Sequence, residues 1–404
     1  MKKRIPVTEK AGVGGAGGKV DLSARKGSGF DDRRQSQPDA ELSGAAFGLK
    51  GKVLVVGGYD QSHLPLYTAE LYDPDTQVWT PTASLFYERA DHVAILLPND
   101  KVLVAGGLMH GPYVDKSVEL FDPTTSEWYA TLRLLALRYS FTATLLQNGK
   151  VLVAGGNYPT HSSTNEAELY DPATQVWTLT GSLSAARSHH TATLLRNGTV
   201  LVLGGLSPHY SNTAELYDPA TGTWAPTSSL FFERFGHTAT LLQNGKVLVA
   251  GGLGLGSTDS LDGVELYDPD VGEWFATGRL HTARRYHTAT LLGDGNVLVV
   301  GGLGGRYNVL NTAELYDPDT QVWTPTASLH SPRITHTATL LTDGRVLVAG
   351  GSNSAELYDP VAGTWANTGN LTASRGYHTA TLIGTKKPLR PPYLSLLLLL
   401  RETG

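Results

Sequence analysis

The sequence predicts an all-β fold in which seven copies of one repeat close into a ring. First, a Gly-Gly doublet recurs at positions 57, 106, 155, 204, 251, 301 and 350, with successive spacings of 49, 49, 49, 47, 50 and 49 residues. Second, all seven tryptophans of the chain follow an Asp-Pro pair at one short spacing. Third, each unit holds four short apolar runs separated by turn residues. Together these features predict a seven-bladed β-propeller with four antiparallel strands per blade.

The four strands of a unit are each marked by their own residues. His190–Leu195 is typical of the innermost strand, Val151–Ala154 of the second and Ala167–Asp171 of the third, while the fourth carries the tryptophan. Runs such as Val-Leu-Val-Ala are apolar throughout, as expected of sheets covered on both faces. Asn-Gly and Asp-Gly pairs should supply the positive φ angles of the hairpin between the first two strands. Asp-Pro pairs should form type I turns between the third and fourth strands.

Ring closure follows from the ends of the repeat pattern. The last good strand, residues 378–383, has no following partner, and the first unit begins at Val53. We therefore expect residues 378–383 to act as the innermost strand of the blade that begins at 53–80, because closure removes exposed sheet edges. The predicted propeller covers residues 43–385. A basic, Gly-rich tail (1–42) and a Pro- and Leu-rich tail (386–404) should be irregular.

Composition excludes several classes of function. The 404 residues carry 32 basic and 37 acidic side chains, a net charge of −5, so no basic field favours nucleic acid. No cysteine is present, which removes disulfides and thiolate chemistry. The apolar run at 394–400 is shorter than the ~20 residues of a membrane span. As written, the sequence indicates a cytoplasmic monomer, and a missing leader would instead make the protein extracellular.

The Gly-Gly, Tyr and Trp positions resemble those of the kelch-repeat propeller family over roughly residues 43–383. The resemblance extends to the propeller of galactose oxidase, whose radical copper cofactor needs a tyrosine cross-linked to a cysteine. Because this chain has no cysteine, that cofactor cannot form, and no cofactor or metal is predicted. In kelch substrate adaptors, arginines at some matching positions bind acidic peptide motifs.

An arginine precedes the innermost strand of every unit. The seven are Arg89, Arg138, Arg187, Arg234, Arg284, Arg333 and Arg375. They should form a ring on the loop face, where guanidinium groups suit carboxylate capture. Each third strand also carries one glutamate: Glu70, Glu119, Glu168, Glu215, Glu265, Glu314 and Glu356. This one-to-one repeat favours a structural interpretation, in which buried ion pairs fix each blade.

Six histidines stand three residues after these arginines, with Phe141 at the seventh position. They are His92, His190, His237, His287, His336 and His378. A ring of imidazoles could bind metal, but a phenylalanine at the equivalent place favours packing around the axis.

The loops between the second and third strands differ most among repeats and should emerge on one face. Their aromatic and polar residues are typical of recognition surfaces. The candidate binding residues are Tyr59, His63, Tyr67, His110, Tyr113, Tyr158, His161, His209, Tyr210, Arg306 and Tyr307. The alternative is that these loops vary without function.

No catalytic constellation is evident, so the sequence favours a non-enzymatic scaffold that binds a protein or peptide partner through the loop face. Residues 69–85 match 313–329 exactly in sequence, and such repetition suits a surface better than an asymmetric active site. The alternative is a carbohydrate-binding or carbohydrate-active propeller, in which the loop tyrosines stack on sugars. Ligand identity stays open.

Overall fold

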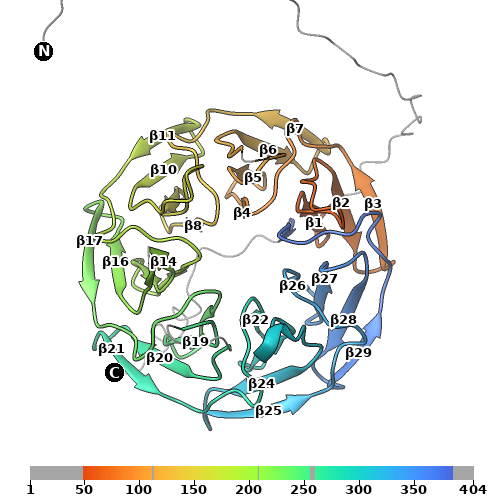
Figure 1. The fold of residues 1–404 in the computed structure, drawn as a ribbon. Helices are drawn as coiled ribbons and strands as arrows, with labels where there is room; N and C mark the ends of the chain where they lie inside the picture. Colours follow the sequence, from red (N-terminus) through yellow and green to blue (C-terminus); the bar gives the residue numbers. More distant parts are fainter. Residues whose placement is uncertain (1–48, 112, 208, 255–259, 385–404) are drawn as a thin grey trace, which may run out of the picture. The chain divides into compact units, whose positions relative to one another are not determined.

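The computed structural model describes residues 49–111, 113–207, 209–254 and 260–384, and these form a seven-bladed β-propeller (Figure 1). Each blade is a four-stranded antiparallel sheet. The predicted fold class is therefore confirmed. The tails predicted at 1–42 and 386–404, and the predicted start of the propeller at 43–48, lie outside the described residues. Among the described residues, no helix is long and apolar enough to cross a membrane.

Strands are grouped here by their place in the blade, from the axis outward. The innermost strands are β4 (Val93–Leu96), β8 (Thr142–Leu145), β12 (Thr191–Leu194), β18 (Thr238–Leu241), β22 (Thr288–Leu291), β26 (Thr337–Leu340) and β30 (Thr379–Leu382). The second strands are β1 (Val53–Val56), β5 (Val102–Ala105), β9 (Val151–Ala154), β13 (Val200–Leu203), β19 (Val247–Ala250), β23 (Val297–Val300) and β27 (Val346–Ala349).

The third and outer strands complete the sheets. The third strands are β2 (Ala69–Asp73), β6 (Val118–Asp122), β10 (Ala167–Asp171), β16 (Ala214–Asp218), β20 (Val264–Asp268), β24 (Ala313–Asp317) and β28 (Ala355–Asp359). The outer strands are β3 (Val78–Thr82), β7 (Glu127–Ala130), β11 (Val176–Leu179), β17 (Thr223–Thr227), β21 (Glu273–Ala276), β25 (Val322–Thr326) and β29 (Thr364–Asn367). Two loops add a short hairpin, β14 (Leu206–Ser207) with β15 (His209–Tyr210), and a 3₁₀ turn, η1 (Gly305–Tyr307).

The ring closes as predicted, by pairing the end of the chain with its beginning. Strand β30 runs antiparallel to β1, with Val53 opposite Leu382 and Val56 opposite Thr379. The sheet order β3-β2-β1-β30 thus combines both ends of the propeller in one blade. Figure 1 shows the blue strand β30 beside the red strand β1 at the axis. Closure leaves no inner strand without a partner in any of the seven sheets.

The core lies between the blades. Seven buried apolar clusters occupy the seven interfaces, and each combines residues of two adjacent sheets. In one of them, Leu201 and Leu203 of β13 pack with Val247 and Val249 of β19. The second strands are buried along their whole length because both faces of every sheet meet a neighbour. This explains the uniformly apolar Val-Leu-Val-Ala runs.

Repeated aromatic residues join each blade to the one before it. The tyrosine of the third strand packs against the tryptophan of the outer strand, as Tyr217 does on Trp224 with ring centroids 5.0 Å apart. Trp224 Nε1 donates a hydrogen bond to the Gly181 carbonyl at 2.7 Å, in the connection from the preceding blade. The Tyr217 hydroxyl bonds Thr180 Oγ1 at 2.7 Å. Every tryptophan in the ring makes the equivalent bond to a carbonyl.

Both predicted turns occur where expected, but their geometry differs from the prediction. In the hairpin at 146–150, Gly149 N donates to Leu146 O at 3.0 Å, and Gly149 alone has positive φ, at 82°. This is a tight turn followed by a glycine bulge, so Asn148 need not be left-handed. The Asp-Pro turns are one residue longer than a type I turn: Gln175 N reaches Asp171 O at 2.7 Å. The Asp171 carboxylate also accepts the N–H of Ala173 at 2.9 Å.

One blade departs from the tyrosine pattern and leaves a polar atom unsatisfied. Phe121 takes the tyrosine position, and the buried Thr82 Oγ1 that would face its hydroxyl has no hydrogen-bond partner. We predict that Phe121→Tyr supplies this bond and raises the free energy of unfolding by about 1 kcal/mol. Urea unfolding would measure the change, with Tyr316→Phe, which removes the same bond to Thr277, as the opposite control. A loss of stability in Phe121→Tyr would contradict the prediction.

Candidate functional site

The seven arginines lie at the loop end of the blades, but their side chains are buried. Each is at most 1% exposed. Each Nη2 contacts the glutamate of the same sheet at 2.5–2.8 Å, in the pairs Arg89–Glu119, Arg138–Glu168, Arg187–Glu215, Arg234–Glu265, Arg284–Glu314, Arg333–Glu356 and Arg375–Glu70. Of the two arrangements considered from the sequence, the structure contains the paired one. These guanidinium groups are therefore not displayed to an acidic ligand.

Each pair also holds main-chain groups of the surrounding loops. Arg187 Nη1 donates to the carbonyls of Gly204 and Thr213 at 2.9 and 3.1 Å. Glu215 Oε2 accepts the N–H of Ser184, in the connection that enters the blade, at 2.7 Å. Burial lowers the pKa of Arg187, and the charge of Glu215 opposes that shift. The pair therefore fixes the entering connection, the Gly-Gly doublet and the third strand relative to one another.

Breaking one pair should lower the free energy of unfolding more than neutralising both of its members. We predict that Arg187→Met lowers the free energy of unfolding by about 3–5 kcal/mol, because Glu215 stays buried without its cation. Adding Glu215→Gln should recover part of the loss, since the amide oxygen can still accept the Ser184 N–H. A double-mutant cycle in urea would measure the coupling. A cost below about 1 kcal/mol for Arg187→Met would contradict a structural role.

The six histidines join neighbouring blades rather than surrounding a metal. Each Nε2 lies 2.9–3.0 Å from a threonine hydroxyl at the start of the preceding innermost strand, in the pairs His92–Thr379, His190–Thr142, His237–Thr191, His287–Thr238, His336–Thr288 and His378–Thr337. At the seventh interface both partners are apolar: Phe141 packs with Val93. The first glycine of each doublet accommodates the ring, because a Cβ on Gly204 would lie 2.7 Å from His237 Cε1.

These imidazoles are held neutral. Burial, and then the charge of the neighbouring arginine, lowers the pKa of His237, His336 and His378 to about 3. The same two causes place the pKa of His92, His190 and His287 well below the usual 6.5. Between pH 3 and 6.5 the unfolded chain therefore binds protons that the folded chain does not. Stability falls as the pH falls through this window.

The Phe141–Val93 interface provides a matched replacement that tests this dependence of stability on pH. We predict that His237→Phe combined with Thr191→Val removes one proton from the unfolding reaction. The stability lost between pH 7 and pH 5 should then shrink by about 2 kcal/mol relative to the parent. Urea unfolding at both pH values would measure it. The reverse pair, Phe141→His with Val93→Thr, should enlarge the loss by a similar amount, and an unchanged pH dependence in both variants would contradict the assignment.

Directly above this histidine layer lies a second ring, here called the rim residues, each two positions after a buried arginine. They are Asp91, Ser140, His189, Gly236, Tyr286, Thr335 and Tyr377. All seven have left-handed backbone, with φ between 50° and 64°, although only one is glycine. Such strain persists only where surrounding structure enforces it, and it clusters at functional sites. The rim is one of two variable positions between each repeated arginine and the histidine or phenylalanine that follows.

Main-chain hydrogen bonds around the axis enforce the rim conformation. Five rim residues donate their N–H to the carbonyl of the preceding rim residue, at 2.8–3.5 Å: Asp91 to Tyr377, Ser140 to Asp91, His189 to Ser140, Tyr286 to Gly236 and Tyr377 to Thr335. A left-handed residue turns its N–H toward the neighbouring blade, which explains why non-glycine side chains accept this conformation here. The rim is therefore a rigid frame that carries six different residue types, with tyrosine at two of its seven positions.

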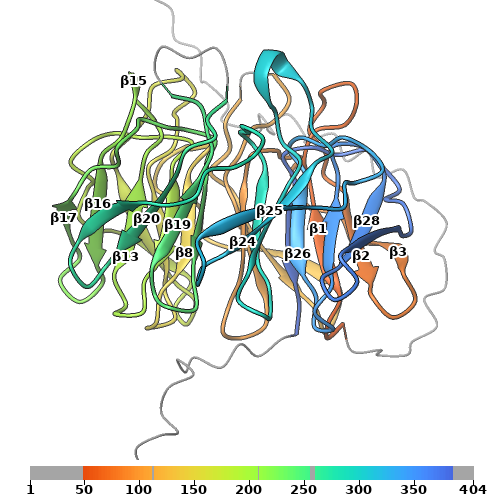
Figure 2. The ribbon, with the colours of Figure 1, turned by 90° about the horizontal axis from the view of Figure 1, so that it is seen from below.

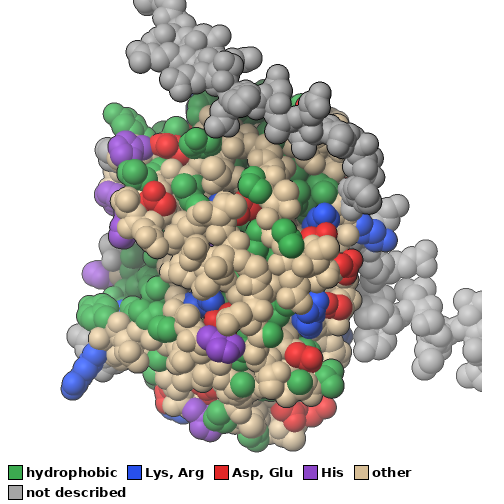
Figure 3. Space-filling view, turned by 90° about the vertical axis from the view of Figure 1, so that its right-hand side faces the viewer, with side chains coloured by type: hydrophobic (Ala, Val, Ile, Leu, Met, Phe, Trp, Pro, Cys, Tyr) green, Lys and Arg blue, Asp and Glu red, His purple; other side chains and the backbone are tan. Residues whose placement is uncertain are grey.

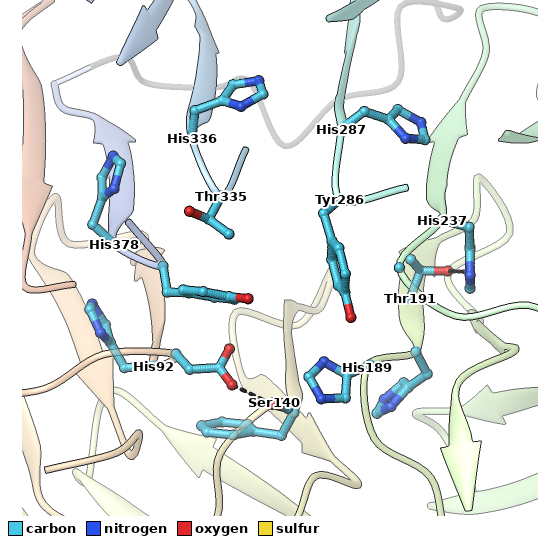
Figure 4. A pocket seen from close by; sticks show the side chains of 15 residues that line it. His92, Ser140, His189, Thr191, His237, Tyr286, His287, Thr335, His336 and His378 are labelled. Atoms are coloured by element: carbon cyan, nitrogen blue, oxygen red, sulfur yellow. Dashed lines mark hydrogen bonds between the residues drawn. The ribbon is translucent and has the colours of Figure 1, made fainter. Parts of the chain in front are cut away.

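Together the rim and the histidine layer line a cavity of about 340 Å³ on the propeller axis. Figure 4 shows His189, Tyr286 and Thr335 reaching into it from different blades, with the histidine layer around them. The Ser140 hydroxyl donates to the Asp91 carboxylate. Burial, more than any charge, raises the pKa of Tyr286 to about 12. The sequence contained this site as the second of two variable positions between each repeated arginine and the histidine or phenylalanine that follows, whereas the sequence prediction placed recognition in the loops between the second and third strands.

The loop residues predicted from sequence divide into two groups. Tyr67, Tyr113 and Tyr307 are 54%, 69% and 74% exposed. His63, His110, His161, His209 and Arg306 are exposed as well. These loops emerge at one end of the ring (Figure 2), and in Figure 3 histidine and hydrophobic side chains gather along the left-hand edge, which is that end. The tight turns occupy the opposite end.

The second group is half-buried and contacts the scaffold or the mouth of the axial cavity. Tyr59 meets the rim residue Tyr377 edge to face, with ring centroids 6.2 Å apart. Tyr210 stacks on Phe235 at 5.0 Å. Tyr158 donates a hydrogen bond from its hydroxyl to Glu166 at 2.8 Å. Tyr59 and Tyr210 thus extend the aromatic wall of the cavity outward, whereas Tyr158 stabilises its own loop.

The arrangement of side chains around the propeller axis also bears on metal binding. Among the described residues, no three His, Asp or Glu side chains are grouped so that they could hold an ion. The six imidazoles already use Nε2 in bonds to threonine, and the chain has no cysteine. The residues lining the cavity therefore do not fit a radical copper centre.

Comparison with known proteins identifies the class to which this fold belongs. Residues 140–351 match the family model of the KLHDC2/KLHL20/DRC7 kelch-repeats domain, and residues 45–85 match the kelch motif. The chain therefore belongs to the kelch-repeat propeller family, as its Gly-Gly, Tyr and Trp pattern predicted. No curated protein sequence matches it.

Two solved structures share the fold. One is described as a novel fungal alcohol oxidase with catalytic diversity among the AA5 family, in complex with copper. It is 21% identical, with a TM-score of 0.63, over 76% of this chain and 69% of that one. The other, described as the structure of YjhT, is 14% identical, with a TM-score of 0.54, over 69% of this chain and 95% of that one. Similarity at these identities shows a common fold alone.

Proposed function

We propose that this protein is a non-enzymatic interaction module that binds a protein or peptide partner through the loop end of its propeller. One observation carries the proposal: side-chain variety among the repeats is concentrated at that end. The rim residues and the loop tips differ from blade to blade, while the arginines, glutamates, histidines and tryptophans around them repeat and are used in the scaffold. A rigid frame with variable loops at one end suits recognition.

The exposed tyrosines support a macromolecular partner. Tyr67, Tyr113 and Tyr307 belong to three different blades and present large rings with few rotatable bonds, as at protein interfaces. Kelch-repeat domains commonly mediate protein interactions. The same rings could stack on sugars, so a carbohydrate ligand is the alternative.

The loop tips can be tested separately from the scaffold. We predict that replacing Tyr67, Tyr113 and Tyr307 together by serine lowers partner retention by the full-length protein at least about tenfold, because exposed aromatic anchors contribute most binding energy. Retention would be measured by pull-down from the native host, with quantitative mass spectrometry.

A matched control removes exposed aromatic rings elsewhere. Tyr129 on β7 and Phe275 on β21 are 40% and 47% exposed on outer strands, and their serine variants should keep the partner. Equal retention by the loop variant and this control would contradict binding at the loop end. A glycan array run with the same proteins distinguishes a sugar ligand from a protein.

A further inference from the structure

The charge of the axial cavity differs from the positive charge that the seven arginines of the sequence suggest. Asp91 is the one carboxylate among its lining residues, and the six histidines of the layer below it are held neutral by burial and by the neighbouring arginines. The ring arginines nearby are each neutralised by a buried glutamate. No lysine or arginine lines the cavity within the described part of the chain. The one carboxylate of the lining is therefore left without a lysine or arginine beside it on the cavity wall.

Asp91 is fixed in place and still has an open side. Its main-chain N–H bonds Tyr377 O at 3.0 Å, and its own carbonyl accepts from Ser140 N at 3.5 Å. Its carboxylate accepts the Ser140 hydroxyl on Oδ2. Among the described residues Asp91 forms no ion pair, and its side chain is half-buried rather than covered. Asp91 is thus a preorganised carboxylate with no cationic partner among the described residues.

Aromatic rings surround this carboxylate. Tyr286 and Tyr377 line the cavity with it, and Tyr59 packs on Tyr377. Phe235 lies 5.9 Å from the Tyr286 ring. The negative charge of Asp91 contributes to the raised pKa values of Tyr59, Tyr139 and Tyr377, after burial, so their hydroxyls lie within its field. A carboxylate with aromatic walls provides both features that attract an organic cation, opposite charge and ring faces.

The basic residue next to the rim already makes such a contact elsewhere. The Arg285 guanidinium lies 5.5 Å from the Tyr307 ring centroid and donates to Ser260 Oγ at 3.3 Å. Its side chain is thus engaged with the loop tip, and it forms no ion pair with Asp91 among the described residues. The partner, rather than this chain, must supply the cation at the axis.

We propose that the axial cavity binds a basic side chain of the partner, a lysine ammonium or an arginine guanidinium, through Asp91. This inference rests on the proposed function in taking the partner to be a protein or peptide. A cavity of about 340 Å³ admits a side chain with its flanking backbone but no folded domain, so the basic residue enters from an extended segment. The family resemblance pointed to an acidic ligand, and the burial of all seven arginines reverses that expectation.

The test uses blocked tripeptides that differ only in their central side chain. Acetyl-Gly-Lys-Gly-amide and acetyl-Gly-Arg-Gly-amide are titrated into the full-length protein by calorimetry at low salt. The norleucine and glutamate peptides serve as neutral and acidic controls. Binding of a basic peptide at least tenfold tighter than that of both controls is the expected result. Equal or tighter binding of the glutamate or norleucine peptide, or no binding of either basic peptide, would overturn the proposal.

A pair of matched variants assigns the binding to Asp91. Asp91→Asn keeps the shape of the side chain, and asparagine tolerates the left-handed backbone. This variant should bind the basic peptides at least tenfold more weakly than the parent. Asp100→Asn makes the same change at another positive-φ position, 66°, in a hairpin turn at the opposite end of the blade, and should bind like the parent. Thermal unfolding verifies that both variants fold. Unchanged binding in Asp91→Asn would place the cation elsewhere and refute the assignment.

The outcomes separate this inference from the proposed function. One outcome is that the tyrosine loop variant loses the host partner while Asp91→Asn retains it at the parental level. In that case the loop end is an interaction surface and the proposed cation site is refuted. If basic peptides bind through Asp91 while the loop variant retains every partner, the axial site stands and the proposed loop surface fails.

Discussion

The buried arginine–glutamate pair is the interaction on which the rest of this propeller depends. In every blade it joins the incoming connection, the Gly-Gly end of the second strand and the third strand. A buried charge without its partner is costly, so once the pair forms, little freedom is left to the loop. The next residues are thereby placed: the rim residue two positions later and the interblade histidine three positions later. The loop end of the propeller is thus built on an internal electrostatic contact.

Repetition in this chain reflects contacts that each interface must make. Where one member of a contact changes, its partner either changes with it or is left unsatisfied. Phe141 and Val93 replace a histidine and a threonine together, which keeps the interface closed. Phe121 replaces a tyrosine alone, and Thr82 loses its partner. The rim residues are free of this constraint because their scaffold contacts use main-chain atoms, which leaves their side chains available for a ligand.

The same arrangement decides the charge displayed at the loop end. Seven arginines near the axis suggest a basic mouth, yet each is neutralised within its own sheet and covered. Six histidines suggest a metal ring, yet each bonds a threonine across an interface and stays neutral. What remains at the axis is one carboxylate, Asp91, among tyrosine rings. The side chains displayed at this end are therefore those that the scaffold does not use.

The sequence by itself determined the number of blades, the four strands of each blade and the closure by residues 378–383, because these follow from local periodicity and repeat spacing. It also suggested the arginine–glutamate pairing, since each repeat holds one of each. Only the tertiary structure decided which polar groups are buried, because burial depends on how sheets stack around the axis. It brought together seven rim residues that are 42–50 positions apart in the sequence. In five of them the left-handed backbone is held by hydrogen bonds between blades, which form only when neighbouring blades stack.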